Sequence, residues 1–147
     1  MGSTFHSLHY HIVFSTKERR ASLRSEWRAR RHAYLGGIIR NQEGVAEAVG
    51  GVEDHVHLLA SSKPTHRIAD VMRDLKRGSS NWVADNFDRQ FAWQEGYAVF
   101  TVSASNTEAV RAYIGRQEEH HKKSGFVDEL KALLEKHGVS YEPNYLV

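Results

Sequence analysis

Hydrophobic residues repeat along the chain with two periods, and the change of period separates predicted strands from predicted helices. Alternation at every second residue predicts a strand over residues 8–14. Short runs around turn residues predict two more, over residues 45–52 and 55–61, and a segment rich in aromatic and β-branched residues predicts a fourth over residues 93–103. Apolar spacings of three and four predict four amphipathic helices, over residues 22–41, 64–86, 105–125 and 126–138. Gly50-Gly51, at the end of the second strand, and Glu53-Asp54, between the second and third, are turn residues that indicate a hairpin.

The predicted order is strand, helix, strand, strand, helix, strand and then two helices. It matches an α+β fold, the ferredoxin-like βαββαβ antiparallel sheet, with C-terminal helices added. We expect one domain over residues 1–147, with a core at about 5–103 and the last two helices at about 105–138. Ser105 and Glu108 have the spacing of a capping box, and Gly125 is a natural helix end. Gly78 is a candidate break in the second helix.

Composition excludes several kinds of chemistry. The 147 residues include no cysteine, so a disulfide framework, a thiolate zinc site and a cysteine nucleophile are excluded. No apolar run approaches the roughly 20 residues of a membrane span, and no signal-peptide pattern opens the chain, so we expect a cytoplasmic protein without a membrane partner. The sequence lacks a glycine-rich phosphate loop, which argues against a nucleotide cofactor. The formal net charge is only +2, but the chain carries 10 histidines.

His55 and His57 are a candidate metal-binding pair. Residues two apart on a strand point to the same face, so the two imidazoles project together. Neutral imidazole is a common ligand of divalent metals. The alternative is a packed or surface pair with no metal, which is the more frequent meaning of His-x-His taken alone.

Tyr113 and Gln117 are four residues apart and share one face of a predicted helix, with His120 and His121 following one turn later. One helix would then supply a nucleophile and a ligand. The alternative is that Tyr113 is a core aromatic and that Gln117 is exposed. Gly115 lies between them, and we consider it a pivot for moving the tyrosine.

Basic residues gather in two segments that are candidates for contact with DNA phosphates. A solvated basic surface is the alternative for each of them. The candidates are Lys17, Arg19, Arg20, Arg24, Lys76 and Arg77.

Taken together, the motifs resemble the small single-tyrosine HUH transposases of bacterial insertion sequences, including the REP-associated tyrosine transposases. The resemblance covers nearly the whole chain. It departs at Glu53, where relatives often carry proline. The motifs are Tyr10-His11 with Phe14 and Lys17, Asp54-His55-Val56-His57-Leu58-Leu59, Leu75-Lys76 with Ser79-Ser80, Trp93-Gln94-Glu95-Gly96-Tyr97, Tyr113 to His121 and Leu133 to Gly138.

The resemblance implies that His55, His57 and Gln117 bind a divalent metal, Mg²⁺ or Mn²⁺. It implies that Tyr113 attacks a phosphodiester of single-stranded DNA and forms a 5′-phosphotyrosine at ends marked by hairpins. His11, His120 and His121 would then lie around the ligands. The family also implies a homodimer, in which the tyrosine helix of one subunit can complete the site of the other.

Two readings without DNA cleavage stay open at this point. One is a ferredoxin-like module that binds RNA or DNA. The other is a non-catalytic or domesticated dimer that retains the metal site or the hairpin binding. Histidines occupy the strand positions where an RNA-recognition module carries stacking aromatics, which weakens the first of these.

Overall fold

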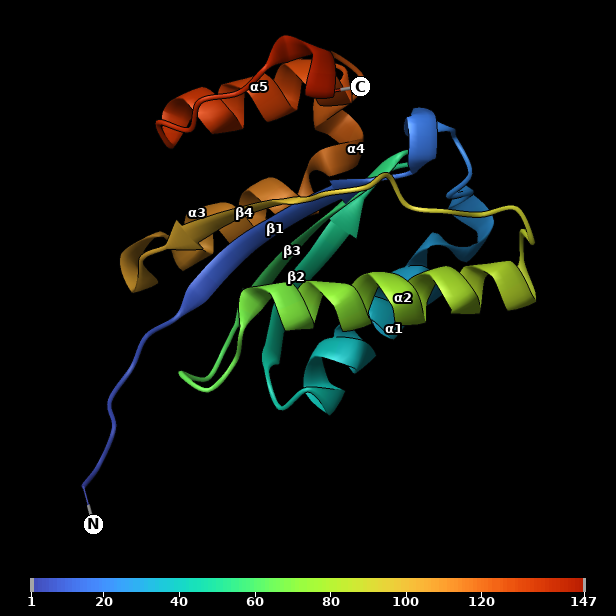
Figure 1. Ribbon diagram of the computed structural model, residues 1–147. Helices are drawn as coiled ribbons and strands as arrows, with labels where there is room; N and C mark the ends of the chain where they lie inside the picture. Colours follow the sequence, from blue (N-terminus) through green and yellow to red (C-terminus); the bar gives the residue numbers. More distant parts are fainter. Residues whose placement is uncertain (1, 147) are drawn as a thin grey trace.

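The computed structural model describes residues 2–146, and within them a four-stranded antiparallel sheet carries helices on both faces (Figure 1). The strands are β1 (His9–Ser15), β2 (Val45–Gly51), β3 (His55–Ser61) and β4 (Ala98–Val102). They lie in the order β2-β3-β1-β4, with β1 and β3 at the centre. Helix α1 (Arg28–Asn41) connects β1 to β2, and helix α2 (Ile68–Asn86) connects β3 to β4. This order confirms the predicted fold.

The first two helices begin later than predicted. Residues 25–27 form a 3-10 turn ahead of α1, although Leu23 and Trp27 are buried as the apolar pattern indicated. Pro64 and Thr65 form a turn rather than the start of α2, and the His66 ring accepts a hydrogen bond from the Lys63 amide across it. A side chain that bonds the backbone locally competes with helix formation, so the helix starts after this turn.

Helix α2 runs through Gly78 without a break, contrary to the expectation that this residue interrupts it. A Cβ at Gly78 would lie 3.1 Å from Ile38 Cδ1, so glycine here allows α1 and α2 to pack closely. The fourth strand is shorter than predicted and spans only residues 98–102. Trp93 pairs with Thr16 in an isolated bridge and packs edge-on against Phe14, so the segment before Ala98 is a loop tied to the core.

The predicted helix over residues 105–125 is divided into α3 (Thr107–Gly115) and α4 (Gln117–His120). Arg116, between them, has φ −102° and ψ 19°, outside the helical range. The capping box also does not form: Ser105 lies in a 3-10 turn, and its hydroxyl pairs with that of Ser103. Helix α5 (Phe126–Lys136) follows the predicted position of the last helix.

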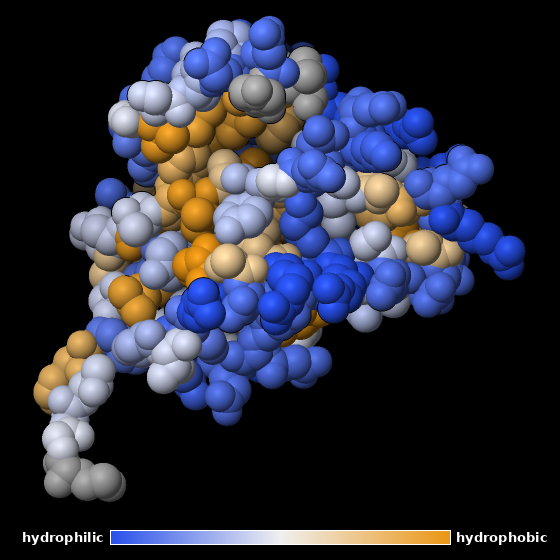
Figure 2. Space-filling model, in the orientation of Figure 1, coloured by the Kyte–Doolittle hydropathy of each residue, from blue (hydrophilic) through white to orange (hydrophobic). Residues whose placement is uncertain are grey.

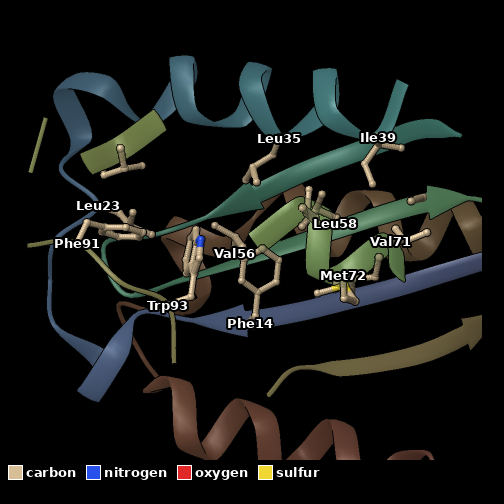
Figure 3. Close-up of a cluster of buried hydrophobic side chains, with 14 of the residues drawn as sticks. Phe14, Leu23, Leu35, Ile39, Val56, Leu58, Val71, Met72, Phe91 and Trp93 are labelled. Atoms are coloured by element: carbon tan, nitrogen blue, oxygen red, sulfur yellow. The ribbon is translucent and has the colours of Figure 1, made fainter. Parts of the chain in front are cut away.

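The main core lies between the sheet and the α1/α2 layer (Figure 3). Alternate residues of the two central strands, Phe14, Val56 and Leu58, point into it. Leu35 of α1 and Leu75 of α2 are completely buried against them. Burial of apolar side chains on this scale is the main source of the stability of the sheet.

The C-terminal helices cover the opposite face of the sheet, with α5 lying above β1 and β4 in Figure 1. Helix α3 packs against β2 and β3, and this contact requires Gly50, because a Cβ there would lie 2.4 Å from the Ile114 carbonyl oxygen. The apolar clusters on this face are smaller, and polar side chains lie between them. Among the described residues, no helix is long and apolar enough to cross a membrane.

Candidate active site

The site is built on the central strand β3, where His55 and His57 are fully buried. They share a face, as their spacing predicts, and that face points toward the C-terminal helices rather than toward α1 and α2. The register places His57 opposite Val13 and His55 opposite Ser15 on β1. Hydrogen-bonded neighbours on both sides hold β3, so the backbone beneath the two imidazoles is fixed.

Each of these rings is held through its Nδ1 atom. His55 Nδ1 lies 2.7 Å from an Asp54 carboxylate oxygen, and His57 Nδ1 lies 2.8 Å from His11 Nε2. Burial and the neighbouring His57 lower the pKa of His11 to about 3, so its ring is neutral and can donate or accept this hydrogen bond, depending on its tautomer. Both arrangements leave the Nε2 atoms of His55 and His57 directed away from the strand, which is how histidines are oriented around a metal.

Glu129 of α5 occupies the centre of the cluster. One carboxylate oxygen, Oε1, lies 3.0 Å from His57 Nε2, 3.2 Å from His55 Nε2 and 2.9 Å from His121 Nε2. The side chain is almost completely buried. A buried carboxylate is stable only when it is paired or hydrogen bonded, and here three imidazoles supply its partners.

Tyr113 and Gln117 reach the same carboxylate from the other side, although the helix is broken between them. The Tyr113 hydroxyl donates to Glu129 Oε2. The Gln117 amide nitrogen donates to the same oxygen at 2.9 Å, and Gln117 Oε1 lies 3.1 Å from His55 Nε2. Gln117 is buried, contrary to the exposed alternative. Tyr113, Gln117 and the histidines therefore form one hydrogen-bonded cluster within one chain.

The charges of the cluster follow from burial and these hydrogen bonds. Burial alone would raise the pKa of Glu129, but hydrogen bonds from His121, His55 and His57 outweigh it and hold the pKa well below its ordinary value. Burial raises the pKa of Tyr113 well above its ordinary value, and the hydrogen bond and charge of Glu129 act in the same direction. The carboxylate is thus ionised and the tyrosine is a neutral phenol at neutral pH.

The two ligand candidates on β3 differ electrostatically. Burial lowers the pKa of His57 and outweighs the attraction of Glu129. Burial also acts to lower the pKa of His55, but Asp54 and Glu129 outweigh it and raise that pKa to about 9. Because Asp54 binds only His55, the second carboxylate explains the difference between the two rings.

The donor atoms can hold a metal ion. Ligand atoms of His55, His57, His121 and Glu129 all lie within 4.8 Å of one another, and Gln117 Oε1 lies 3.0 Å from His121 Nε2. Nitrogen and oxygen donors of this kind suit a divalent metal. His120 is placed farther out, with its Nε2 atom 3.5 Å from Glu129 Oε2.

The predicted DNA-contacting residues have different surroundings in the structure. Arg19 lines a shallow hollow with Asp54 and the start of α5, next to the histidines. Arg20 and Arg24 line another hollow, over Trp27 and Phe87 at the ends of α1 and α2. Lys17 and Arg77 are exposed.

Lys76 has a structural contact. It donates to the carbonyl oxygens of Gln94 and Gly96 at 2.6 and 2.8 Å, and so ties α2 to the loop before β4. Its ammonium group is therefore already hydrogen bonded in this structure, unlike an exposed lysine available to a phosphate.

Sequence reasoning missed Glu129, although the chain contains a signal for it. The apolar face of the last helix is marked by Phe126, Leu130 and Leu133. Glu129 lies three residues after Phe126 and four before Leu133, so it falls on the buried face. A carboxylate at such a position needs a partner inside the protein, and the partners are the histidines.

Fold and site together define an α+β protein with a tyrosine, glutamine and paired-histidine centre. The sequence matches the family described as "Transposase IS200 like" over residues 4–117. The chain belongs to the IS200-like transposase family, and its activity class is DNA transposition. The match includes His55, His57, Tyr113 and Gln117 and ends before α5, so Glu129 lies outside it.

Two solved structures are similar to this chain. A crystal structure of a candidate transposase from Deinococcus radiodurans R1 is 26% identical, with a TM-score of 0.64, covering 80% of this chain and 96% of that one. A REP-associated tyrosine transposase bound to a REP hairpin is 12% identical, with a TM-score of 0.61, covering 82% of this chain and 74% of that one. The second similarity shows the shared fold. No curated protein matched the sequence.

Proposed function

We propose that this transposase cleaves and rejoins single-stranded DNA at hairpin-marked ends, with Tyr113 as the nucleophile and a divalent metal as its cofactor. The observation that carries the proposal is the single cluster in which the Tyr113 hydroxyl, the Gln117 amide and the two β3 histidines meet around Glu129. A tyrosine held beside a metal-ligand set has the elements of nucleophilic catalysis on a phosphate.

His55, His57 and Gln117 would hold the metal, with Glu129 and His121 as further ligands. A bound divalent ion polarises the scissile phosphate and offsets the negative charge that develops on it. Three imidazoles favour Mn²⁺ over Mg²⁺, because Mg²⁺ prefers oxygen ligands and retains its waters. The Asp54 and His11 contacts would keep the two β3 rings in the ligand orientation.

The chain supplies the rest of the reaction through its own side chains. The Tyr113 oxygen forms a bond to phosphorus as the bond from phosphorus to the 3′ oxygen breaks, which leaves a 5′-phosphotyrosine and a free 3′-hydroxyl. Tyr113 must lose its proton as it attacks, and the carboxylate that accepts its hydrogen bond is Glu129. The 3′ oxygen takes up a proton as it leaves. Because the phosphodiester is exchanged for another ester, rejoining needs no nucleotide hydrolysis.

We further propose that the DNA partner carries a hairpin, since the structurally similar REP-associated transposase is bound to one. Among the predicted DNA contacts, Arg19 lines a hollow together with Asp54, the residue hydrogen bonded to His55. The homodimer stays a prediction for light scattering in solution. Within one chain, Tyr113 already lies beside its own histidines, so cleavage would not need a partner's tyrosine.

The test is a covalent adduct assay on a denaturing gel, checked by intact mass. Labelled single-stranded hairpin oligonucleotides from the flanks of the gene are incubated with Mn²⁺ or Mg²⁺. We expect an adduct with the wild-type protein and none with Tyr113→Phe or His57→Ala. Arg111→Ala, an exposed change on α3, is the control and should retain the adduct.

The outcomes separate the functions. An adduct that survives in Tyr113→Phe would exclude this residue as the nucleophile. Hairpin binding without any adduct, in either metal, would favour a non-catalytic binding protein.

A further inference from the structure

A groove opens from the Tyr113 side of the cluster between α3, α5 and β4. It has a volume of about 560 Å³ and includes Tyr113 and Glu129 in its wall. This size is in the range of small-ligand sites in proteins. Figure 2 shows that apolar surface gathers beneath the α5 layer, where this layer meets the rest of the molecule.

The floor of the groove is aliphatic. Val102 of β4, Val110 of α3 and Leu133 of α5 line it, together with Ala109 and other small residues. At one end, the His137 ring stacks on Phe100, with centroids 4.4 Å apart and an interplanar angle of 16°. His137 is exposed, so Phe100 covers one face of the ring and the other remains open to a ligand. An open aromatic face beside an aliphatic floor is suited to a planar, apolar group such as a nucleobase.

The charge of the rim favours an anion. Arg116 and Lys136 line the groove, are exposed, and have no ion-pair partner within residues 2–146. Asp128 is the exposed carboxylate of the lining, and Glu129 is already engaged by the histidines. A base on the floor and a phosphate at the rim would therefore satisfy both kinds of surface.

We propose that this groove binds one nucleotide next to the scissile phosphate, with its base on His137 and the aliphatic floor and its phosphate toward Arg116 and Lys136. The inference rests on the proposed function and adds to it the place of the substrate. Two nucleosides are covalently joined to an attacked phosphate, so one of them must lie against the walls around the Tyr113 hydroxyl. Tyr113 lines this groove, so the groove is where we place that nucleoside.

The experiment measures binding apart from chemistry. The full chain with Tyr113→Phe is titrated with single-stranded oligonucleotides that carry the fluorescent base 2-aminopurine at successive positions beside the hairpin. We expect a change of fluorescence at one position. Ala109→Trp, which fills the groove, should abolish that change and weaken binding about tenfold, the size of a lost base stack.

Ala112→Trp is the matched control, because Ala112 is exposed on the same helix but does not line the groove. It should retain both the signal and the affinity. His137→Ala is a second test at an exposed position, and it should reduce the fluorescence change without filling any space. Circular dichroism and a urea midpoint establish that each variant is folded.

The proposal is overturned if Ala109→Trp and Ala112→Trp bind alike, if no labelled position responds, or if the protein binds no single-stranded DNA. Failure of the proposed function gives a different result: the groove signal would be present while the wild-type protein forms no adduct. A third result is also informative: the wild-type protein forms an adduct, and Ala109→Trp and Ala112→Trp, each made with Tyr113 intact, form it equally fast. That result would support Tyr113 as the nucleophile and contradict nucleotide binding in the groove.

Discussion

The two faces of one sheet are built for different purposes. On the α1/α2 face, the central strands contribute only apolar side chains to a continuous core. On the α3 to α5 face, the same strands contribute His11, His55 and His57, and a carboxylate is buried among them. The strands alternate, so β1 and β3 serve both faces at once. The comparison shows how a stable apolar layer supports a polar cluster that is costly to bury.

The largest expected effect on stability comes from the apolar face. Leu75→Ala should lower the free energy of unfolding by about 2–5 kcal/mol, since it empties a fully buried position in the larger cluster. Leu134→Ala, in the smaller cluster of the opposite face, should fall at or below the low end of that range. Urea denaturation of both variants checks the prediction. Equal losses would show that the two faces contribute alike.

The docking of α3 provides the next test. Gly50→Ala should destabilise the protein by about 1–3 kcal/mol and displace the tyrosine helix, because the added methyl group meets the Ile114 backbone. Gly115→Ala is the matched control: a Cβ there meets nothing within 4 Å, so stability and adduct formation should be unchanged. Loss of rejoining in Gly115→Ala alone would instead support a pivot at that glycine.

Glu129 tests the polar face directly. Glu129→Gln should weaken Mn²⁺ binding by about 10–100-fold, because a charged oxygen donor is replaced by a neutral amide at the centre of three imidazoles. Asp128→Asn removes an exposed carboxylate from the same helix and should leave the affinity unchanged. Isothermal titration calorimetry measures both. Identical affinities in the two variants would remove Glu129 from the ligand set.

The smallest expected effect is a loss of stability at acidic pH that depends on His32 of α1. Burial, followed by the charges of Arg31 and Arg28, lowers the pKa of His32 to about 3, and the Arg31 guanidinium donates to His32 Nε2. In the unfolded chain, His32 takes up a proton near pH 6.5, but in the folded chain it stays neutral until the pH is far lower. The free energy of unfolding therefore falls as the pH drops below 6.5.

Between pH 7 and pH 5, the His32 contribution to this loss should be about 1–2 kcal/mol. His32→Gln should reduce the acid-induced fall by that amount, measured by urea denaturation at both pH values. His66→Gln, at a half-buried ring in the turn before α2, is the comparison variant. An unchanged pH dependence in His32→Gln would show that His32 is free to protonate in the folded protein.

Local pattern was sufficient for the first three strands and for the shared face of His55 and His57. Alternation and helical spacing depend on backbone geometry over a few residues, and a sequence displays that geometry directly. Pattern alone was misleading at Ser105, Pro64 and Gly78. At each of these, a contact with a distant residue or a local turn replaced the expected cap, start or break.

The sequence by itself determined the order of the elements, the face of β3 that carries the histidines, and the spacing of Tyr113 and Gln117. Only the tertiary structure placed Glu129 between Tyr113 and the β3 histidines and formed the groove beside Tyr113. Glu129 is 72 residues from His57, and its role depends on how α5 docks across the sheet. The docking of α5 depends on how whole helices and strands pack together. The residues that determine this packing are spread along the chain, so no short motif predicts it.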